Sequence, residues 1–413
     1  MLVNSNNIGH VRAAMVGVLL LGVLGGMIAT GFVPPYRVIF AETYGLSQGE
    51  LGTAIALIGI VLGGIGVWQG PRLADWLGRY RLLKICVGLM AVGLAGCGLF
   101  TNILVVALFW SMFIFAAYLS IIVNAVVADL WHGQPLRGVM KLQTLNSLGK
   151  IAGPSLAALF MLGVPGCRPW RGYFIFAATL ALMIFLLLSF APQRKVYYPS
   201  SQHPYRDDKP GHSLGVWLAA GLLGLVAGGE SALATITPAF FRSVRGLSYE
   251  MSAQMLTFHL VALTAGRFFI GILGGRSNLR RLLGLGMVPA LLAIPAIWCS
   301  RPGLFVPSFI LLGLCFSFAW PSIYVHLADR FSRGRSRFTF AVGLMNAAGI
   351  SAGLVATSWL FESRPKLAML FGPGLTAACV AIFLLHERFK PPAQTVEPSY
   401  RQPAAPNTSL IRP

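Results

Sequence analysis

The strongest constraint on this chain is a series of long apolar runs separated by short polar segments. A helix needs roughly 20 mostly apolar residues to cross a membrane, and it satisfies its own backbone hydrogen bonds where water is absent. Of the 413 residues, 56% are hydrophobic and only 11% are charged, and the mean hydropathy is +0.72. The sequence therefore predicts an all-α polytopic membrane protein with twelve transmembrane helices, at residues 13–40, 50–70, 85–101, 103–128, 142–163, 173–191, 215–241, 251–275, 284–299, 305–327, 338–361 and 368–387.

The net charge of +20 is spread unevenly over the segments between these helices. Of the 32 Lys and Arg residues, 22 fall at the N-terminus, in alternate connecting segments and in the tail, whereas seven fall in the remaining loops. Segments rich in Lys and Arg stay on the cytoplasmic side of a membrane protein. Both termini are therefore predicted to be cytoplasmic, and the charge requires no nucleic-acid partner.

The longest polar stretch, QRKVYYPSSQHPYRDDKPGHS, predicts a linker between two similar halves. The predicted parts are an N-terminal six-helix half at 1–191, a cytoplasmic linker at 192–214, a C-terminal six-helix half at 215–387 and a cytoplasmic tail at 388–413. A shift of 200 residues superposes Glu50 on Glu250, Asp129 on Asp329, Asn146 on Asn346, Gly149 on Gly349 and Gly153 on Gly353. Duplication of a six-helix unit explains these matches, and the alternative is chance agreement in a chain rich in Gly and Leu. Parallel repeats of this kind are typical of transporters whose halves rock about a central site.

The segment after the second predicted helix reads GPRLADWLGRYRLLK. Its residues Leu73, Ala74, Asp75, Gly78 and Arg79 match the signature Gly-x-Leu-Ala-Asp-Arg-x-Gly-Arg-Arg, so the chain resembles the major facilitator superfamily of transporters. The second half carries a degraded copy at 271–281, in which glycine stands in the place of the aspartate. The resemblance implies a twelve-helix fold of two halves, and it names no substrate.

In the family that the chain resembles, this loop acts as a gate. A carboxylate at its start pairs with arginines or with a helix N-terminus of the other half and thereby latches one conformation. The predicted latch residues are Asp75, Gly78, Arg79, Asp129, Arg276 and Asp329. For the three acids, the alternative is a solvated carboxylate at the end of a helix.

Three further stretches resemble parts of known facilitators. NSLGKIAGPSLAA is similar to their Gly-x-x-x-Gly-Pro stretch, which implies close helix packing through Gly149 and Gly153 and a bend at Pro154. Drug:proton antiporters end this motif in Gly-Gly, whereas Ala157 and Ala158 stand here. IIVNAVVADL and GLCFSFAWPSIYVHL resemble the fourth and tenth helices of the fucose and glucose proton symporters, but the acids of that branch are absent.

Glu230 is the only one of the twelve acids that lies well inside a predicted helix. A carboxylate buried in a bilayer is costly and marks a site of proton coupling or substrate contact, and the alternative is a structural partner of a nearby cation. Lys150 and His259 are too deep in their helices to reach the headgroups comfortably, and either could counter Glu230 or an anionic solute. The other candidates for coupling or substrate contact are Arg267, Asn124, Trp320 and His326.

Alternatives remain for each of these candidates. Structural pairing is the alternative for Lys150, and a packed neutral ring for His259. Arg267 is expected to stabilise the helix bundle more than to bind substrate, and the aromatic residues serve packing more often than ligand contact. Arg37, near the outer end of the first helix, is expected to reach the lipid headgroups.

No phosphate-binding loop, zinc pair or catalytic triad occurs, so no enzyme activity, cofactor or metal site is expected. The sequence predicts a secondary active, proton-coupled transporter of a small organic solute, monomeric, in a bacterial inner membrane. A multidrug or metabolite efflux antiporter is one alternative. A transporter-like receptor or a membrane enzyme without solute flux is another.

Overall fold

The computed structural model describes residues 5–130, 135–162, 169–190, 213–273, 288–298, 302–330 and 335–388. The predicted linker lies outside these residues apart from its last two, and the predicted tail lies outside them apart from its first. All regular secondary structure in the described ranges is helical. The helices are α1 (Ser5–Gly31), α2 (Val33–Tyr44), α3 (Gln48–Leu77), α4 (Arg79–Leu99), α5 (Ile103–Leu119), the 3-10 turn η1 (Ser120–Ile122), α6 (Val123–Leu130), α7 (Pro135–Leu162), α8 (Pro169–Ser189), α9 (Ser213–Ser243), α10 (Tyr249–Leu273), α12 (Val288–Trp298), α13 (Pro302–Arg330), α14 (Arg335–Ser363) and α15 (Pro365–Arg388).

Two of the predicted helices are interrupted. The run predicted at 13–40 is divided into α1 and α2 at Phe32, and the proline pair Pro34–Pro35 lies in the first turn of α2. The run predicted at 103–128 is divided into α5 and α6 by the 3-10 turn at Ser120–Ile122. Within the described ranges, nine helices are long and apolar enough to cross a membrane.

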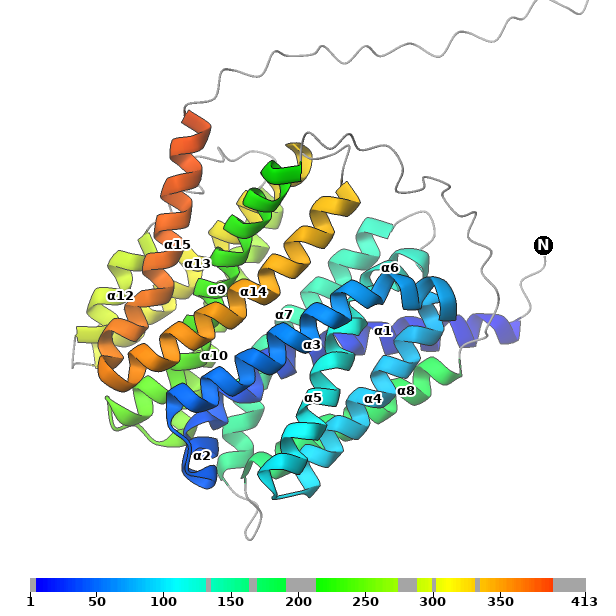
Figure 1. Cartoon of the computed structure of the whole chain (residues 1–413), viewed down its shortest axis with the longest axis horizontal. Helices are drawn as coiled ribbons and strands as arrows, with labels where there is room; N and C mark the ends of the chain where they lie inside the picture. The colour runs from blue at the N-terminus through cyan, green and yellow to red at the C-terminus, as the bar shows by residue number, and fades with distance from the viewer. Residues whose placement is uncertain are drawn as a thin grey trace, which may run out of the picture.

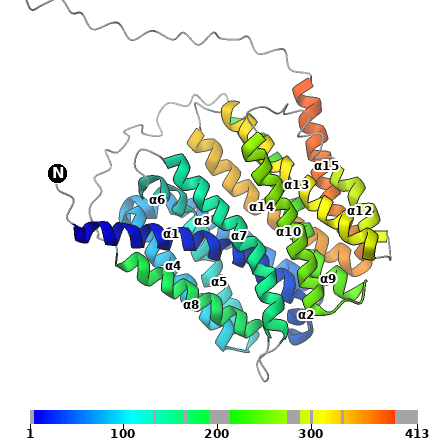
Figure 2. The same ribbon diagram turned by 180° about the vertical axis from the view of Figure 1, so that it is seen from behind.

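The helices form two groups that follow the order of the chain. Figures 1 and 2 show α1 to α8 as one group and α9 to α15 as the other. The core of the first group is aromatic, with Phe32 stacked on Phe174 at 4.5 Å and edge-on to Tyr173 at 5.0 Å. Such stacked and edge-on pairs add stability beyond the apolar area that they bury. Separate apolar clusters fill the second group.

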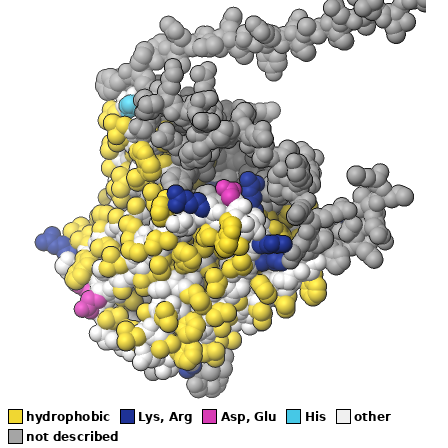
Figure 3. Space-filling view, turned by 45° about the vertical axis from the view of Figure 1, so that its right-hand side comes forward, with side chains coloured by type: hydrophobic (Ala, Val, Ile, Leu, Met, Phe, Trp, Pro, Cys, Tyr) yellow, Lys and Arg dark blue, Asp and Glu magenta, His cyan; other side chains and the backbone are white. Residues whose placement is uncertain are grey.

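Much of the molecular surface is apolar, as a bilayer requires. Leu104 is 77% exposed and Leu162 is 71% exposed. In Figure 3 hydrophobic side chains cover most of the visible face, and several charged side chains lie close to the residues drawn in grey. An outer surface with many exposed apolar side chains is unfavourable in water and favourable against lipid.

Each group contains a pair of helices in backbone contact through glycines at corresponding positions. In the first, Gly149 and Gly153 of α7 lie against α1, and a Cβ built on Gly153 would lie 2.8 Å from Met27 O. In the second, Gly349 and Gly353 of α14 lie against α9, and a Cβ on Gly353 would lie 2.7 Å from Gly228 O. Small residues permit this approach. The two pairs correspond under the 200-residue shift seen in the sequence.

The turns that begin α3 and α10 correspond at a shift of 201 residues rather than 200. Gly45 and Gly246 both adopt left-handed backbone conformations, with φ of 64° and 67°. Ser47 and Ser248 follow them, and the side chain of each accepts a hydrogen bond from the backbone N–H three residues later. Glu50 completes a capping box with Ser47. The structural equivalent of Glu50 is therefore Met251, and the sequence match of Glu50 with Glu250 is wrong by one residue.

Candidate functional site

A cluster of one acid and two bases lies where the two groups of helices meet. Glu230 of α9 accepts a hydrogen bond from Arg267 of α10, with Nη2 and Oε2 2.7 Å apart. Lys150 of α7 approaches from the other group, with Nζ 3.9 Å from Glu230 Oε1. The side chains of Glu230, Lys150 and Arg267 are 16%, 24% and 25% exposed. The cluster is therefore partly accessible, and its three members form one site.

The local packing explains how Lys150 reaches the opposite group. Gly149 brings the α7 backbone against Val23 of α1, and the hydroxyl of Thr30 donates a hydrogen bond to the Lys150 carbonyl oxygen at 2.7 Å. Farther along α7, the Ser155 hydroxyl lies 3.2 Å from the Thr257 hydroxyl of α10. These contacts hold α7 between α1 and α10, so Lys150 faces the charged pair on α9 and α10.

His259 of α10 lies beside the aromatic rings of α13. It is 1% exposed, its ring centroid lies 5.1 Å from that of Phe309, and its Nδ1 has no hydrogen-bond partner. His259 is therefore packed among aromatic rings, and its role as a relay or as a packing residue stays a prediction.

The remaining candidates for solute contact lie on other helices. On α13, the Trp320 ring stacks on Tyr324 with centroids 5.0 Å apart, and its buried Nε1 has no partner. His326 meets Phe383 edge-on at 5.5 Å. Asn124 belongs to α6, but its side chain lies outside the described part of the structure.

The predicted latch is described only in part. Asp75 is exposed near the end of α3, and no hydrogen bond or ion pair joins it to another described residue. Gly78 connects α3 to α4 with φ of 83°, a conformation that side chains rarely adopt, and Arg79 begins α4. Arg276 and the side chains of Asp129 and Asp329 lie outside the described residues.

The expectation that Arg37 reaches the lipid headgroups is wrong. Its side chain is fully buried, and it donates hydrogen bonds to Gln48 Oε1 at 2.6 Å and to Ser358 Oγ at 2.5 Å. Ser358 belongs to α14, so Arg37 joins the two groups of helices. Gly52 permits this contact, because a Cβ there would lie 3.0 Å from Arg37 Nη2. Nothing in the sequence pattern indicates a partner 321 residues away.

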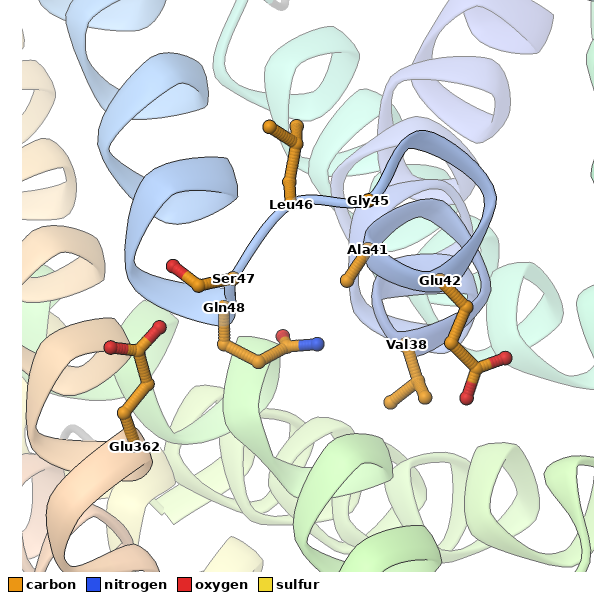
Figure 4. Close-up of a pocket in the computed structure, with 8 residues that line it drawn as sticks. All are labelled: Val38, Ala41, Glu42, Gly45, Leu46, Ser47, Gln48 and Glu362. Atoms are coloured by element: carbon orange, nitrogen blue, oxygen red, sulfur yellow. The ribbon is translucent and has the colours of Figure 1, made fainter.

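Other cross-group contacts gather at the same end of the bundle, which we call the gate end and define by Arg37, Gln48, Ser358 and Glu362. The Gly49 amide donates to Glu362 Oε1 at 2.6 Å, the Trp359 indole donates to Thr53 at 3.0 Å, and the Tyr249 hydroxyl donates to Glu42 at 3.1 Å. Figure 4 shows an open depression here, with Val38 and Glu42 on one side and Glu362 on the other. From this end α3 and α14 diverge in Figure 1.

Metal binding has no support in the described ranges. Among the described residues, no three or more His, Cys, Asp or Glu side chains lie close enough together to hold an ion. The chemistry of the cluster is instead that of a carboxylate that gains or loses a proton, and of two cations that can bind an anion.

Two helical groups with an apolar outer surface and a charged cluster between them define a multi-pass membrane transporter. The family model described as Major Facilitator Superfamily matches residues 18–262 and 216–413, so the chain belongs to this superfamily. Its members are transporters and not enzymes.

Individual relatives agree with this assignment. An uncharacterized MFS-type transporter, YdgK of Bacillus subtilis (strain 168), is 26% identical over 301 residues, which cover 70% of this chain and 73% of the relative. The inward open xylose transporter XylE from E. coli is similar with a TM-score of 0.70 and 16% identity, covering 92% of this chain and 95% of XylE. The nucleoside transporter NupG has a TM-score of 0.69 at 13% identity, covering 94% of this chain and 100% of NupG.

Proposed function

We propose that the protein is a secondary active, proton-coupled transporter of a small organic solute. It crosses the bacterial inner membrane twelve times, with both termini in the cytoplasm, and works as a monomer by alternating access. The single observation that carries this proposal is the position of Glu230. This carboxylate is paired within its own half and meets Lys150 of the other half, at a site that remains partly accessible.

The arrangement supports coupling because Glu230 joins protonation to the relative position of the halves. Ionised Glu230 attracts Lys150 across the interface and therefore favours the arrangement in which the halves are close. Protonation removes this attraction and weakens the bond to Arg267. A proton taken up on one side of the membrane and released on the other is then linked to the rocking of the halves.

The gate end supports an assignment of conformation. Its cross-group hydrogen bonds involve α2, α3, α10 and α14, whereas Asp75, on the far end of α3, is exposed. The distribution of Lys and Arg assigns the gate end to the outer face of the membrane. The conformation is then closed on the outside, with the Asp75 latch released.

Transport in proteoliposomes tests the proposal through Glu230→Gln. We expect the variant to lose pH-gradient-driven accumulation by at least about 100-fold while it retains exchange of solute between equal concentrations, because only accumulation requires the proton. The matched control is Glu250→Gln, which changes the same chemical group in the first turn of α10.

Two outcomes would contradict the proposal. Equal accumulation by wild type and Glu230→Gln would remove this residue from coupling. Absence of flux for every member of a broad solute library, under an imposed pH gradient, would instead favour the receptor alternative.

A further inference from the structure

The charged cluster carries a surplus of positive charge. One carboxylate, Glu230, faces two basic side chains, Lys150 and Arg267. A net charge within a membrane protein is costly unless a partner neutralises it. We propose that this site binds a small organic anion through its carboxylate, so that the transported solute offsets the positive charge added when Glu230 takes up a proton. The inference rests on the proposed transport function and names the class of solute that it moves.

The two bases retain unused hydrogen-bonding capacity. Arg267 uses Nη2 for Glu230, while its Nε is buried and has no partner. Arginine binds carboxylates through two parallel N–H bonds, so this guanidinium is only partly satisfied. Lys150 Nζ is 3.9 Å from Glu230, beyond hydrogen-bonding distance, and no described residue accepts a hydrogen bond from it. An anion between Lys150 and Arg267 would satisfy both.

The other helices packed against α9 provide no neutralising acid at this level. In the described structure, α2, α10, α13, α14 and α15 pack against α9. Their acids are near helix ends, at Glu42, Glu250, Asp329, Glu362 and Glu387. His259 of α10 is a base and adds no negative charge. Among the described parts of these helices, no second acid offsets the two bases, and the carboxylate of a solute can take that place.

Proton and anion binding then support each other. Ionised Glu230 competes with the carboxylate of the solute for Arg267 and Lys150. When Glu230 takes up a proton, both bases become available to the solute. One proton and one monocarboxylate enter together, the site keeps its net charge of one, and the coupled step transfers no net charge across the membrane.

Binding to the purified protein in detergent tests this proposal without any transport. The probes are matched pairs of small carboxylates and their primary amides, from acetate and lactate to benzoate and indole-3-acetate, together with D-xylose as a neutral sugar. We measure affinity by calorimetry or by the shift in unfolding temperature. At least one carboxylate should bind at least about tenfold more tightly than its amide, and its affinity should rise as the pH is lowered.

Substitutions assign the effect to the cluster. Lys150→Gln should weaken binding of that carboxylate at least about tenfold, and Lys150→Arg should restore most of it. Glu230→Gln should bind it more tightly than wild type at neutral pH and lose the pH dependence. Lys366→Gln, the same change at an exposed position, should leave binding unchanged.

The possible outcomes separate this inference from the proposed function. Amides or D-xylose that bind as tightly as every carboxylate overturn the anion site, and so does unaltered carboxylate binding in Lys150→Gln. Proton-driven accumulation of a neutral solute, without carboxylate binding, would support the proposed transport function and contradict the anion site. Carboxylate binding without any flux would support the anion site and contradict the proposed transport function.

Discussion

Two cationic sites join the halves of this transporter, and they are satisfied in opposite ways. At the gate end, Arg37 is fully buried, and two of its three nitrogens donate to Gln48 and Ser358, which carry no charge. In the central cluster, Lys150 and Arg267 are about one quarter exposed and share a single carboxylate. The hydrogen-bond partners of Arg37 do not titrate, whereas the carboxylate shared by Lys150 and Arg267 does. The comparison indicates that the gate end closes the structure and that the central cluster responds to protons and solute.

A covalent bond between the halves should have the largest effect. A Cβ built on Gly59 of α3 would lie 3.5 Å from Ser351 Oγ of α14, which suits a disulfide. In a background without native cysteines, oxidation of the pair Gly59→Cys and Ser351→Cys should abolish transport, and reduction should restore it. Gly59→Cys alone is the control. Undiminished transport in the oxidised pair would mean that the halves do not move apart here.

The next largest effect is expected for Arg267→Met. It leaves Glu230 with only the distant Lys150, and breaking a buried pair costs about 3 kcal/mol of unfolding free energy. The double variant Arg267→Met with Glu230→Gln should recover most of this loss, measured by denaturation in micelles. Arg364→Met, at an exposed position, is the control. If the double variant is no more stable than Arg267→Met, the pair is not coupled.

Arg37→Met should cost about 2 kcal/mol, because it leaves the Gln48 side chain and Ser358 without their donor in a buried site. Transport should fall because closure of the gate end loses its cross-half bonds. In contrast to the stability of Arg267→Met, the stability of Arg37→Met should not be restored by a substitution at Glu230. Rescue of Arg37→Met by Glu230→Gln would show that the two sites are not separate.

Ser358→Ala should cost about 1 kcal/mol, since it removes only one acceptor of Arg37. The neighbouring Thr357 is equally buried but bonds only to carbonyl oxygens of its own helix. Thr357→Val is therefore a matched control with a smaller expected loss. Equal losses in unfolding free energy would argue that the bond across the halves contributes nothing.

The smallest effect is expected for Glu42→Gln. Its contact with the Tyr249 hydroxyl is exposed. Loss of an exposed polar contact changes the unfolding free energy by about 0.5 kcal/mol or less. Transport rate and unfolding temperature should both stay close to those of the wild type. A large loss would show that the rim of the gate end, and not only Arg37, keeps it closed.

The sequence predicted the composition of the central cluster better than that of the gate end. Glu230 stood out because an acid inside an apolar run is costly, and Lys150 and Arg267 stood out for the same reason. Their grouping followed only from the fold. Arg37 was misassigned because its place near the end of a helix fits both a headgroup contact and a buried bond. Only the direction that its side chain faces, and the nearness of Ser358, distinguish the two.

The same limit applies to the helices and their connections. Apolar runs predicted the helices but not the breaks at Phe32 and at Ser120–Ile122. The hydropathy of such a run is the same whether the helix is continuous or interrupted. The match of Glu50 with Glu250 was wrong because one extra residue precedes α10. Close helix packing at the glycines was easier to predict, because small residues at helical spacing permit two helix backbones to touch.

The backbone contact between α1 and α7 has a consequence for how the transporter stores energy. Gly149 lies against Val23, and Thr30 donates a hydrogen bond to the Lys150 carbonyl oxygen, so the backbone at Lys150 has little freedom to move relative to its own half. Arg267 and Glu230 likewise belong to one half. A small rotation between the halves must therefore appear as a change in the distance from Lys150 to Glu230, while the bond from Arg267 stays intact. The electrostatic energy between Lys150 and Glu230 therefore depends on the angle between the two halves.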